Sequence, residues 1–112
     1  MSAKKVLIAD YERSVRESLG LVFAQHGCEC RTVEEGEEAL ATAAAWVPDV
    51  VVMDLLLIEN ARTHRDRIPA AVILLLTSTS PPTLLKAAEE LGLRVFQKPV
   101  RPQILLEAAG AL

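Results

Sequence analysis

Two aspartates that each end a short apolar run are the residues of this chain best placed to do chemistry. Asp54 follows the run 50–53, and Asp10 follows the run 6–9. Uninterrupted apolar runs of this length are typical of strands buried on both faces of a parallel sheet. Open α/β sheets place their ligand sites at the C-terminal ends of such strands, although an acid there can also be only the polar end of a strand.

The other group with possible chemistry is the run His26, Cys28 and Cys30. Imidazole nitrogens and thiolates suit zinc, but the sequence offers no second cluster of such ligands. Two cysteines that are two apart in a strand point to the same face and cannot readily bond to each other. We therefore expect reduced structural thiols here, with a zinc site as the alternative.

The elements that must position the aspartates alternate between strands and helices. Apolar runs predict strands over residues 6–9, 28–33, 50–54, 72–77 and 94–97. Helical spacing and caps predict helices from about residue 15 to a stop at Gly27, over 37–46, from about 82 to a stop at Gly92, and over 102–109. The polar segment 59–67 predicts only a short or irregular third helix.

This alternation predicts an α/β fold with right-handed crossovers and a parallel sheet covered by helices on both faces. Five strands fit the flavodoxin-like order 2-1-3-4-5. In that order strands one and three are neighbours, so Asp10 and Asp54 should lie side by side. Two carboxylates that close repel each other unless a cation, a proton or a lysine lies between them.

Composition limits the class of protein. The 112 residues, of which 51% are hydrophobic and 24% charged, predict a single globular domain over 1–112. No apolar run is long enough to cross a bilayer and no signal peptide is visible, so we expect a soluble cytoplasmic protein without membrane contacts. A net charge of −3 argues against direct nucleic acid binding by this domain. An effector domain beyond Leu112 stays open.

Four features close strands one, three, four and five: Asp10, Asp54, Thr77 and the pair Lys98-Pro99. Together and in this order they resemble the receiver domain of two-component response regulators. The resemblance covers essentially the whole chain, including residues 36–40 and the helix-ending Gly92. It implies a phosphorelay signalling module rather than an enzyme, which takes a phosphoryl group from a histidine kinase or a phosphotransfer protein and then switches a protein-interaction face.

The resemblance also implies a role for each site residue. A carboxylate held at a strand end can attack phosphorus in line, and the implied phosphoacceptor is Asp54. Thr77 would hydrogen-bond the phosphoryl oxygen, and Lys98 would neutralise its charge. Magnesium is the implied cofactor, and the Lys98-Pro99 peptide is expected to be cis. The implied metal ligands are Asp10, Asp54 and the backbone carbonyl of Leu56, and Glu12 is a further candidate.

Several positions depart from the receiver pattern. The family places a second acid after the first strand, where this chain has Tyr11, and a neutral phenol is a poor ligand for a hard cation. Glu12 could reach the metal, but it starts from a different direction. The usual proline after the phosphoacceptor is Ile58, and the usual aromatic before the lysine is Val95. These departures keep open a pseudo-receiver, which retains the fold as an interaction module with lost or weakened phosphorylation.

The resemblance places partner contacts on the last strand and its flanking helices. Residues 104–106 offer one more apolar side chain than a single buried stripe needs. A homodimer or a partner contact is therefore a hypothesis, with Leu106 as the residue to replace. Phe96 should face the opposite side of its strand from Val95 because side chains alternate along a strand.

Overall fold

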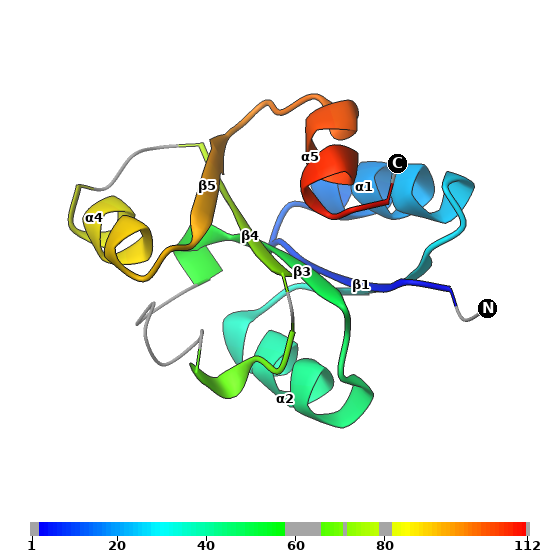
Figure 1. The fold of residues 1–112 in the computed structure, drawn as a ribbon, viewed down its shortest axis with the longest axis horizontal. Helices are drawn as coiled ribbons and strands as arrows, with labels where there is room; N and C mark the ends of the chain where they lie inside the picture. The colour runs from blue at the N-terminus through cyan, green and yellow to red at the C-terminus, as the bar shows by residue number, and fades with distance from the viewer. Residues whose placement is uncertain (1–2, 58–65, 71, 79–81, 112) are drawn as a thin grey trace.

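The computed structural model describes residues 3–57, 66–70, 72–78 and 82–111, in which strands and helices alternate (Figure 1). In chain order the elements are β1 (Lys5–Ala9), α1 (Arg13–Gln25), β2 (Glu29–Val33), α2 (Gly36–Trp46), β3 (Val50–Asp54), the 3-10 helix η1 (Leu55–Leu57), β4 (Val72–Thr77), α4 (Pro82–Glu90), β5 (Arg94–Gln97) and α5 (Pro102–Ala108). The predicted strands and helices are confirmed. The prediction for the third helix falls mostly on residues 58–65, outside the described residues. No helix in the described part of the chain is both long and apolar enough to cross a membrane.

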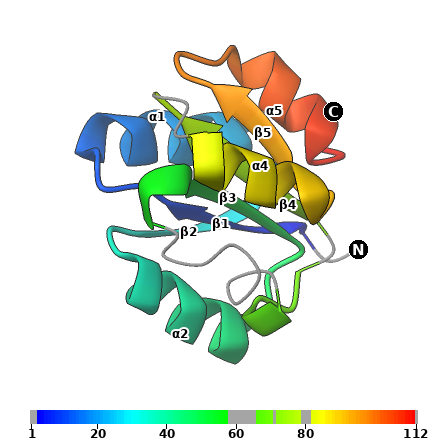
Figure 2. The ribbon, with the colours of Figure 1, turned by 90° about the vertical axis from the view of Figure 1, so that its left-hand side faces the viewer.

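The five strands form one parallel sheet in the order β2-β1-β3-β4-β5, which confirms the predicted flavodoxin-like topology. Helices α1 and α5 cover one face, and α2 and α4 lie toward the other (Figure 2). The central strand β3 is buried along its whole length, as its unbroken apolar run predicts. The parallel order brings the C-terminal ends of β1, β3 and β4 to one edge.

Two apolar clusters, one on each face, hold the helices to the sheet. Alternate residues of the strands point to opposite faces, so Leu7 and Val51 join the cluster under α2 while Val6 and Val50 join the one under α1. The same alternation operates on β5. Val95 packs against the first cluster and Phe96 against the second, which confirms their predicted opposite orientations.

The two cysteines are free, half-buried thiols beside and within the edge strand β2. Burial raises the pKa of both Cys28 and Cys30, so neither is readily ionised. The ring of His26 approaches the carbonyl of Val22 in its own helix, with 3.0 Å between Nδ1 and the oxygen. Among the described residues this run does not gather into a metal-binding group, and the zinc alternative therefore has no structural support.

Helix α2 ends at a strained residue. Val47 has φ 52° and ψ 69°, a left-handed conformation that costs an ordinary L-residue roughly 1–2 kcal/mol. Val47 is 52% exposed and is not part of the buried core. The chain accepts this conformation because the Val47 N–H still donates to the carbonyl of Ala43 and so closes the helix.

Replacing Val47 by glycine is therefore expected to raise the free energy of unfolding by roughly 0.5–1 kcal/mol, because glycine adopts the left-handed conformation without steric cost. Urea unfolding of the two proteins measures the difference. The matched control is Ala44→Gly at an exposed position inside the same helix, which should instead lower stability by about 1 kcal/mol. A Val47→Gly protein less stable than the parent would contradict this explanation.

Candidate functional site

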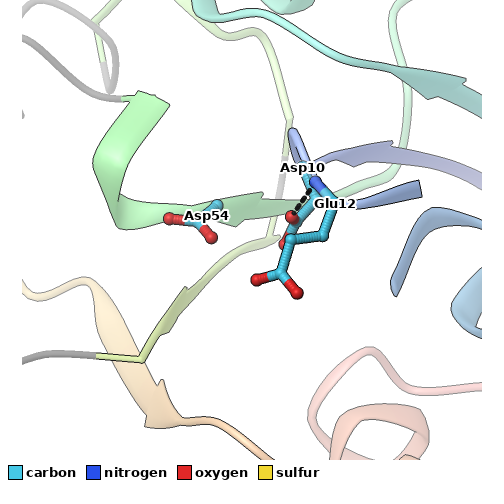
Figure 3. Close-up of side chains that lie close together, drawn as sticks. All are labelled: Asp10, Glu12 and Asp54. Carbon is cyan, nitrogen blue, oxygen red and sulfur yellow. Dashed lines mark hydrogen bonds between the residues drawn. The ribbon is translucent and has the colours of Figure 1, made fainter. Parts of the chain in front are cut away.

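Asp10 and Asp54 lie next to each other at the C-terminal edge of the sheet. β1 and β3 are paired neighbours, and both aspartates follow or end these strands in register. Their side chains are almost fully buried, with 1% exposure for Asp10 and none for Asp54. Figure 3 shows the two carboxylates together with that of Glu12, and one ligand oxygen from each of the three lies within 4.8 Å of the others. The predicted proximity of the two aspartates is confirmed.

One oxygen of each aspartate is fixed by a backbone N–H group two residues further on. The N–H of Leu56 donates to Asp54 Oδ1 at 2.7 Å, and the N–H of Glu12 donates to Asp10 Oδ1 at 2.8 Å. Such short loops hold the carboxylates in a set orientation, and each second oxygen points into the site. The contact of Leu56 with the site is thus the hydrogen bond from its N–H to Asp54. Metal binding by its carbonyl stays a prediction.

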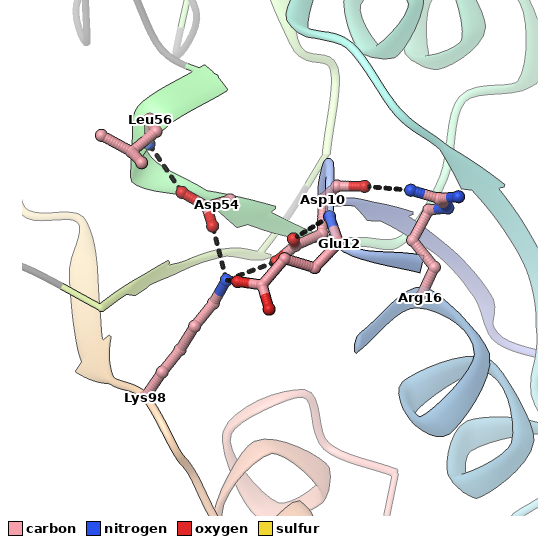
Figure 4. A network of polar contacts seen from close by, with 6 residues as sticks. All are labelled: Asp10, Glu12, Arg16, Asp54, Leu56 and Lys98. Carbon is pink, nitrogen blue, oxygen red and sulfur yellow. Dashed lines mark hydrogen bonds and ion pairs between the residues drawn. The ribbon is translucent and has the colours of Figure 1, made fainter. Parts of the chain in front are cut away.

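Lys98 supplies the cation that two adjacent buried carboxylates require. Its ammonium nitrogen lies 2.5 Å from Asp54 Oδ2, 2.8 Å from Asp10 Oδ2 and 3.2 Å from Glu12 Oε1 (Figure 4). The lysine side chain is only 10% exposed, so these are charge-assisted contacts in a largely dry environment. The structure therefore brings together Asp10, Asp54 and Lys98 from three separate strand ends.

Burial and charge act in opposite directions on the ionisation of this cluster. Burial by itself raises the pKa of Asp10, and its hydrogen bond with Lys98 offsets only part of that effect. Burial lowers the pKa of Lys98, but its hydrogen bonds with Asp10 and Asp54 outweigh this and raise the pKa above its usual range. The ammonium is therefore fully charged at neutral pH, and it stabilises the carboxylates around it.

Thr77 ends β4 on the same edge of the sheet and is 2% exposed. Its carbonyl accepts a hydrogen bond of 2.7 Å from the backbone N–H of Lys98, which ties the end of β4 to the loop after β5. The Lys98-Pro99 peptide is cis, as expected. Thr77 is thus held beside the lysine, and its predicted contact with a phosphoryl oxygen stays a prediction.

A groove opens beside this cluster. It has a volume of about 480 Å³ and runs between the start of α1 and the loop that follows β5. Glu12 and Lys98 are among its lining residues, while Val15, Leu76, Pro99 and Val100 make the lining mainly apolar. A partner side chain lying in this groove would come close to the carboxylates.

Tyr11 and Glu12 take different positions after β1. The side chain of Tyr11 is 48% exposed, and the centre of its ring lies 5.8 Å from the Lys98 ammonium nitrogen. Glu12, although it starts one residue further on, turns its carboxylate toward Asp10 and Asp54 (Figure 3). The acid that the sequence left uncertain is thus the one that reaches the site.

One residue of this region was missed from the sequence. Arg16, only 14% exposed at its side chain, donates from Nη1 to the backbone carbonyl of Asp10 at 2.8 Å (Figure 4). The available signal was a cation near the first turn of a helix, where the helix dipole disfavours positive charge. An arginine at such a position indicates a partner outside the helix, and here that partner is the end of β1.

Comparisons with known proteins agree with this fold. The family model for the response regulator receiver domain matches residues 6–110. The regulatory protein AtoC of Escherichia coli strain K12 is 32% identical over 106 residues, an alignment that covers 88% of this chain and 22% of AtoC. The chain therefore spans about a fifth of that relative.

Solved structures give the same result for the fold. The CheY-like response regulator receiver domain protein from Methanospirillum hungatei JF-1 superposes with a TM-score of 0.85 at 20% identity, over 95% of this chain and 90% of that one. The chemotaxis response regulator CheY4 of Vibrio cholerae has a TM-score of 0.81 at 26% identity, over 99% and 100% of the two chains. Because the family model matches nearly the whole chain, this chain belongs to the response regulator receiver domain family.

Proposed function

We propose that this chain is the receiver module of a two-component phosphorelay and that it accepts a phosphoryl group on Asp54. The observation that carries this proposal is the arrangement around Asp54, a fully buried carboxylate with one oxygen held by the Leu56 N–H and the other by the Lys98 ammonium. A nucleophile held this rigidly at a strand end is ready for in-line attack on phosphorus.

The residues around Asp54 account for the charge that this transfer creates. In phosphoryl transfer the protein mainly positions the groups and neutralises negative charge on the phosphoryl oxygens. The Lys98 ammonium lies 2.5 Å from Asp54 Oδ2. It is therefore close enough to pair with the oxygens of a phosphoryl group on Asp54. Thr77 lies at the end of the adjacent strand β4, and its hydroxyl would donate to one of them, which links the reaction to the segment after β4.

The carboxylates also fit a magnesium ion. Mg²⁺ prefers hard oxygen ligands, and the cluster of Asp10, Glu12 and Asp54 presents carboxylate oxygens within 4.8 Å of one another. Asp10, Asp54 and the carbonyl of Leu56 would hold the ion. When bound, the ion would neutralise charge on the transferred group. Lys98 would then give up part of its contact with the carboxylates.

The partner that supplies the phosphoryl group would be a histidine kinase or a phosphotransfer protein. Such a donor must bring a phosphorylated side chain to Asp54, and the apolar groove between α1 and the loop after β5 lies directly beside the site. The proposal therefore assigns donor docking to this groove, with Val15 and Pro99 as contact residues.

The test is phosphoryl uptake by the purified chain. Incubation with Mg²⁺ and a small phosphodonor such as acetyl phosphate is expected to add the mass of one phosphoryl group to the intact protein. Chelation of the metal should prevent the gain. No gain under any donor or metal concentration would overturn the proposal.

A second candidate function is the pseudo-receiver, and one observation favours it. The observation is that Tyr11, at the position of the usual second acid, offers no carboxylate to a metal. In that case the chain would act as an interaction module, and neither metal nor phosphodonor would change it. Clear Mg²⁺ binding at millimolar concentration or below, measured by calorimetry, would exclude this candidate.

The interaction face requires one correction. Leu106 was the residue selected to test a dimer or partner contact, but it is 1% exposed and packs against α1 and the sheet. The extra apolar side chain of this run is Ile104, which is 37% exposed, while Leu105 is buried as well. The helical turn forces this result, because only two of three consecutive side chains can face the core.

A partner contact through α5 is therefore proposed at Ile104. Ile104→Glu is expected to leave the free energy of unfolding within about 0.5 kcal/mol of the parent, because the site is at the surface, and to weaken any dimer seen by size-exclusion chromatography. Leu106→Glu should instead unfold the domain, since it buries a charge without a partner. An Ile104→Glu protein that elutes as the parent does at every concentration would remove the basis for a dimer through α5.

A further inference from the structure

The position of Glu12 compensates for the missing acid at position 11. We propose that Glu12 supplies the exposed metal-ligating carboxylate of this receiver, so that divalent cation binding acts directly on the residue that begins α1. The inference rests on the proposed function of the Asp54 site and adds the residue on which its metal dependence relies.

The geometry gives the first support. The carboxylates of Asp10, Glu12 and Asp54 converge, and all three contact the same cation, the Lys98 ammonium. The lysine shows that this group of carboxylates can surround one cation.

Of the three carboxylates, Glu12 can most easily break its contact with Lys98 and bind a metal instead. Its contact with Lys98, at 3.2 Å, is the longest of the three, and its side chain is 39% exposed whereas Asp10 and Asp54 are buried. Moving a partly exposed carboxylate costs little, because it remains hydrated in both positions. Asp10 and Asp54 can thus keep their fixed orientations while Glu12 adjusts.

Tyr11 does not compete for this role. A phenol oxygen is a weaker ligand for a hard cation than a carboxylate oxygen. Tyr11 is 48% exposed, and the centre of its ring lies 5.8 Å from the Lys98 ammonium nitrogen. The carboxylate ligand expected at position 11 is therefore supplied by Glu12, one residue further along the chain.

This move has a consequence for α1. Glu12 is the N-cap residue of that helix, and its side chain makes no capping hydrogen bond. Its carboxylate is therefore not needed to close the helix and remains available for a metal. Metal binding through Glu12 would fix the residue at which α1 begins, so the first turn, which includes Ser14 and Val15 in the groove, would become more ordered.

The experiment is calorimetric titration of Mg²⁺, repeated with Mn²⁺, into the full chain without any phosphodonor. Glu12→Gln is expected to weaken binding at least about tenfold, since it removes one anionic ligand and keeps the shape. Glu37→Gln, which removes the same charge from an exposed position at the start of α2, is the matched control and should change affinity by less than about twofold. Adding Tyr11→Asp to Glu12→Gln should restore most of the loss.

Amide hydrogen exchange provides a second readout that does not depend on affinity. Saturating metal should slow exchange in the first turn of α1 in the parent and not in Glu12→Gln. Equal affinities for the parent and Glu12→Gln, equal losses for Glu12→Gln and Glu37→Gln, or no metal binding by the parent would each overturn the inference. A chain that binds metal through Glu12 but takes up no phosphoryl group would overturn only the proposed function.

Discussion

Replacing Lys98 by methionine is expected to lower the free energy of unfolding by about 3 kcal/mol at neutral pH, because it leaves buried carboxylates without their cation. In the parent, the ammonium contacts Asp10, Glu12 and Asp54 at 2.5–3.2 Å, and two of these acids are essentially excluded from water. Methionine fills a similar volume, so the loss would report charge rather than packing. Urea unfolding followed by circular dichroism measures it.

The pH dependence of this variant identifies the cause. Without Lys98, burial and mutual repulsion favour protonated carboxyl groups in the folded state, so the variant should regain stability as the pH falls toward about 5. In the parent, the raised pKa of Lys98 gives a stabilisation that is complete below 10.5, its ordinary pKa, and is lost as the pH rises through the higher folded value. The raised pKa of Asp10 acts in the same direction, since folding then favours the protonated acid.

The matched control for this experiment is Lys86→Met on the exposed side of α4. It removes the same charge from a solvated position, and it should change stability by less than about 0.5 kcal/mol at either pH. If Lys98→Met were as stable as the parent at neutral pH, the lysine would not be compensating the carboxylates. A large loss that does not diminish at lower pH would assign its effect to packing.

Asp54→Asn is expected to abolish phosphoryl uptake completely. The amide has nearly the shape of the carboxylate and can still accept a hydrogen bond from the Leu56 N–H, but it is not a nucleophile toward phosphorus. Lys98 keeps its contacts with Asp10 and Glu12, so the fold should persist. Intact-protein mass spectrometry after incubation with acetyl phosphate and Mg²⁺ compares the parent with the variant.

The control for this substitution is Glu89→Gln, an exposed acid on α4, which should take up phosphoryl as the parent does. Uptake by Asp54→Asn at the parental level would mean that another residue is modified. Loss of uptake in both variants would indicate that overall charge, rather than the Asp54 nucleophile, controls the reaction.

The fold could be predicted from the sequence because its signals are local. The strands Val50–Asp54 and Val72–Thr77 are apolar up to their last residue, and Gly27 and Gly92 adopt the positive φ that ends a helix. Once strands and helices alternate, handedness and strand order leave few topologies. Asp10, Asp54, Thr77 and Lys98 therefore had to reach one edge of the sheet.

The remaining features depend on contacts between distant segments. The loop after β5 decides that one ammonium contacts three acids. Its Lys98 is 86 residues from Glu12 in the chain, so no local pattern predicts their contact. The turn of Glu12 toward the site and the reach of Arg16 to the Asp10 carbonyl depend on how α1 leaves β1, which no spacing rule specifies. Whether Ile104 or Leu106 is the exposed residue depends on how α5 is rotated about its own axis when it packs on the sheet.

The most direct test of the central claim is to locate the phosphoryl group. Acyl phosphates are reduced by borohydride, so treatment of the phosphorylated chain followed by peptide mass analysis would identify the modified residue. We predict conversion of Asp54, in the peptide that joins β3 to η1, and of no other acid in the chain. An unmodified Asp54 in protein that has gained phosphoryl mass, or modification of a different carboxylate, would contradict the account.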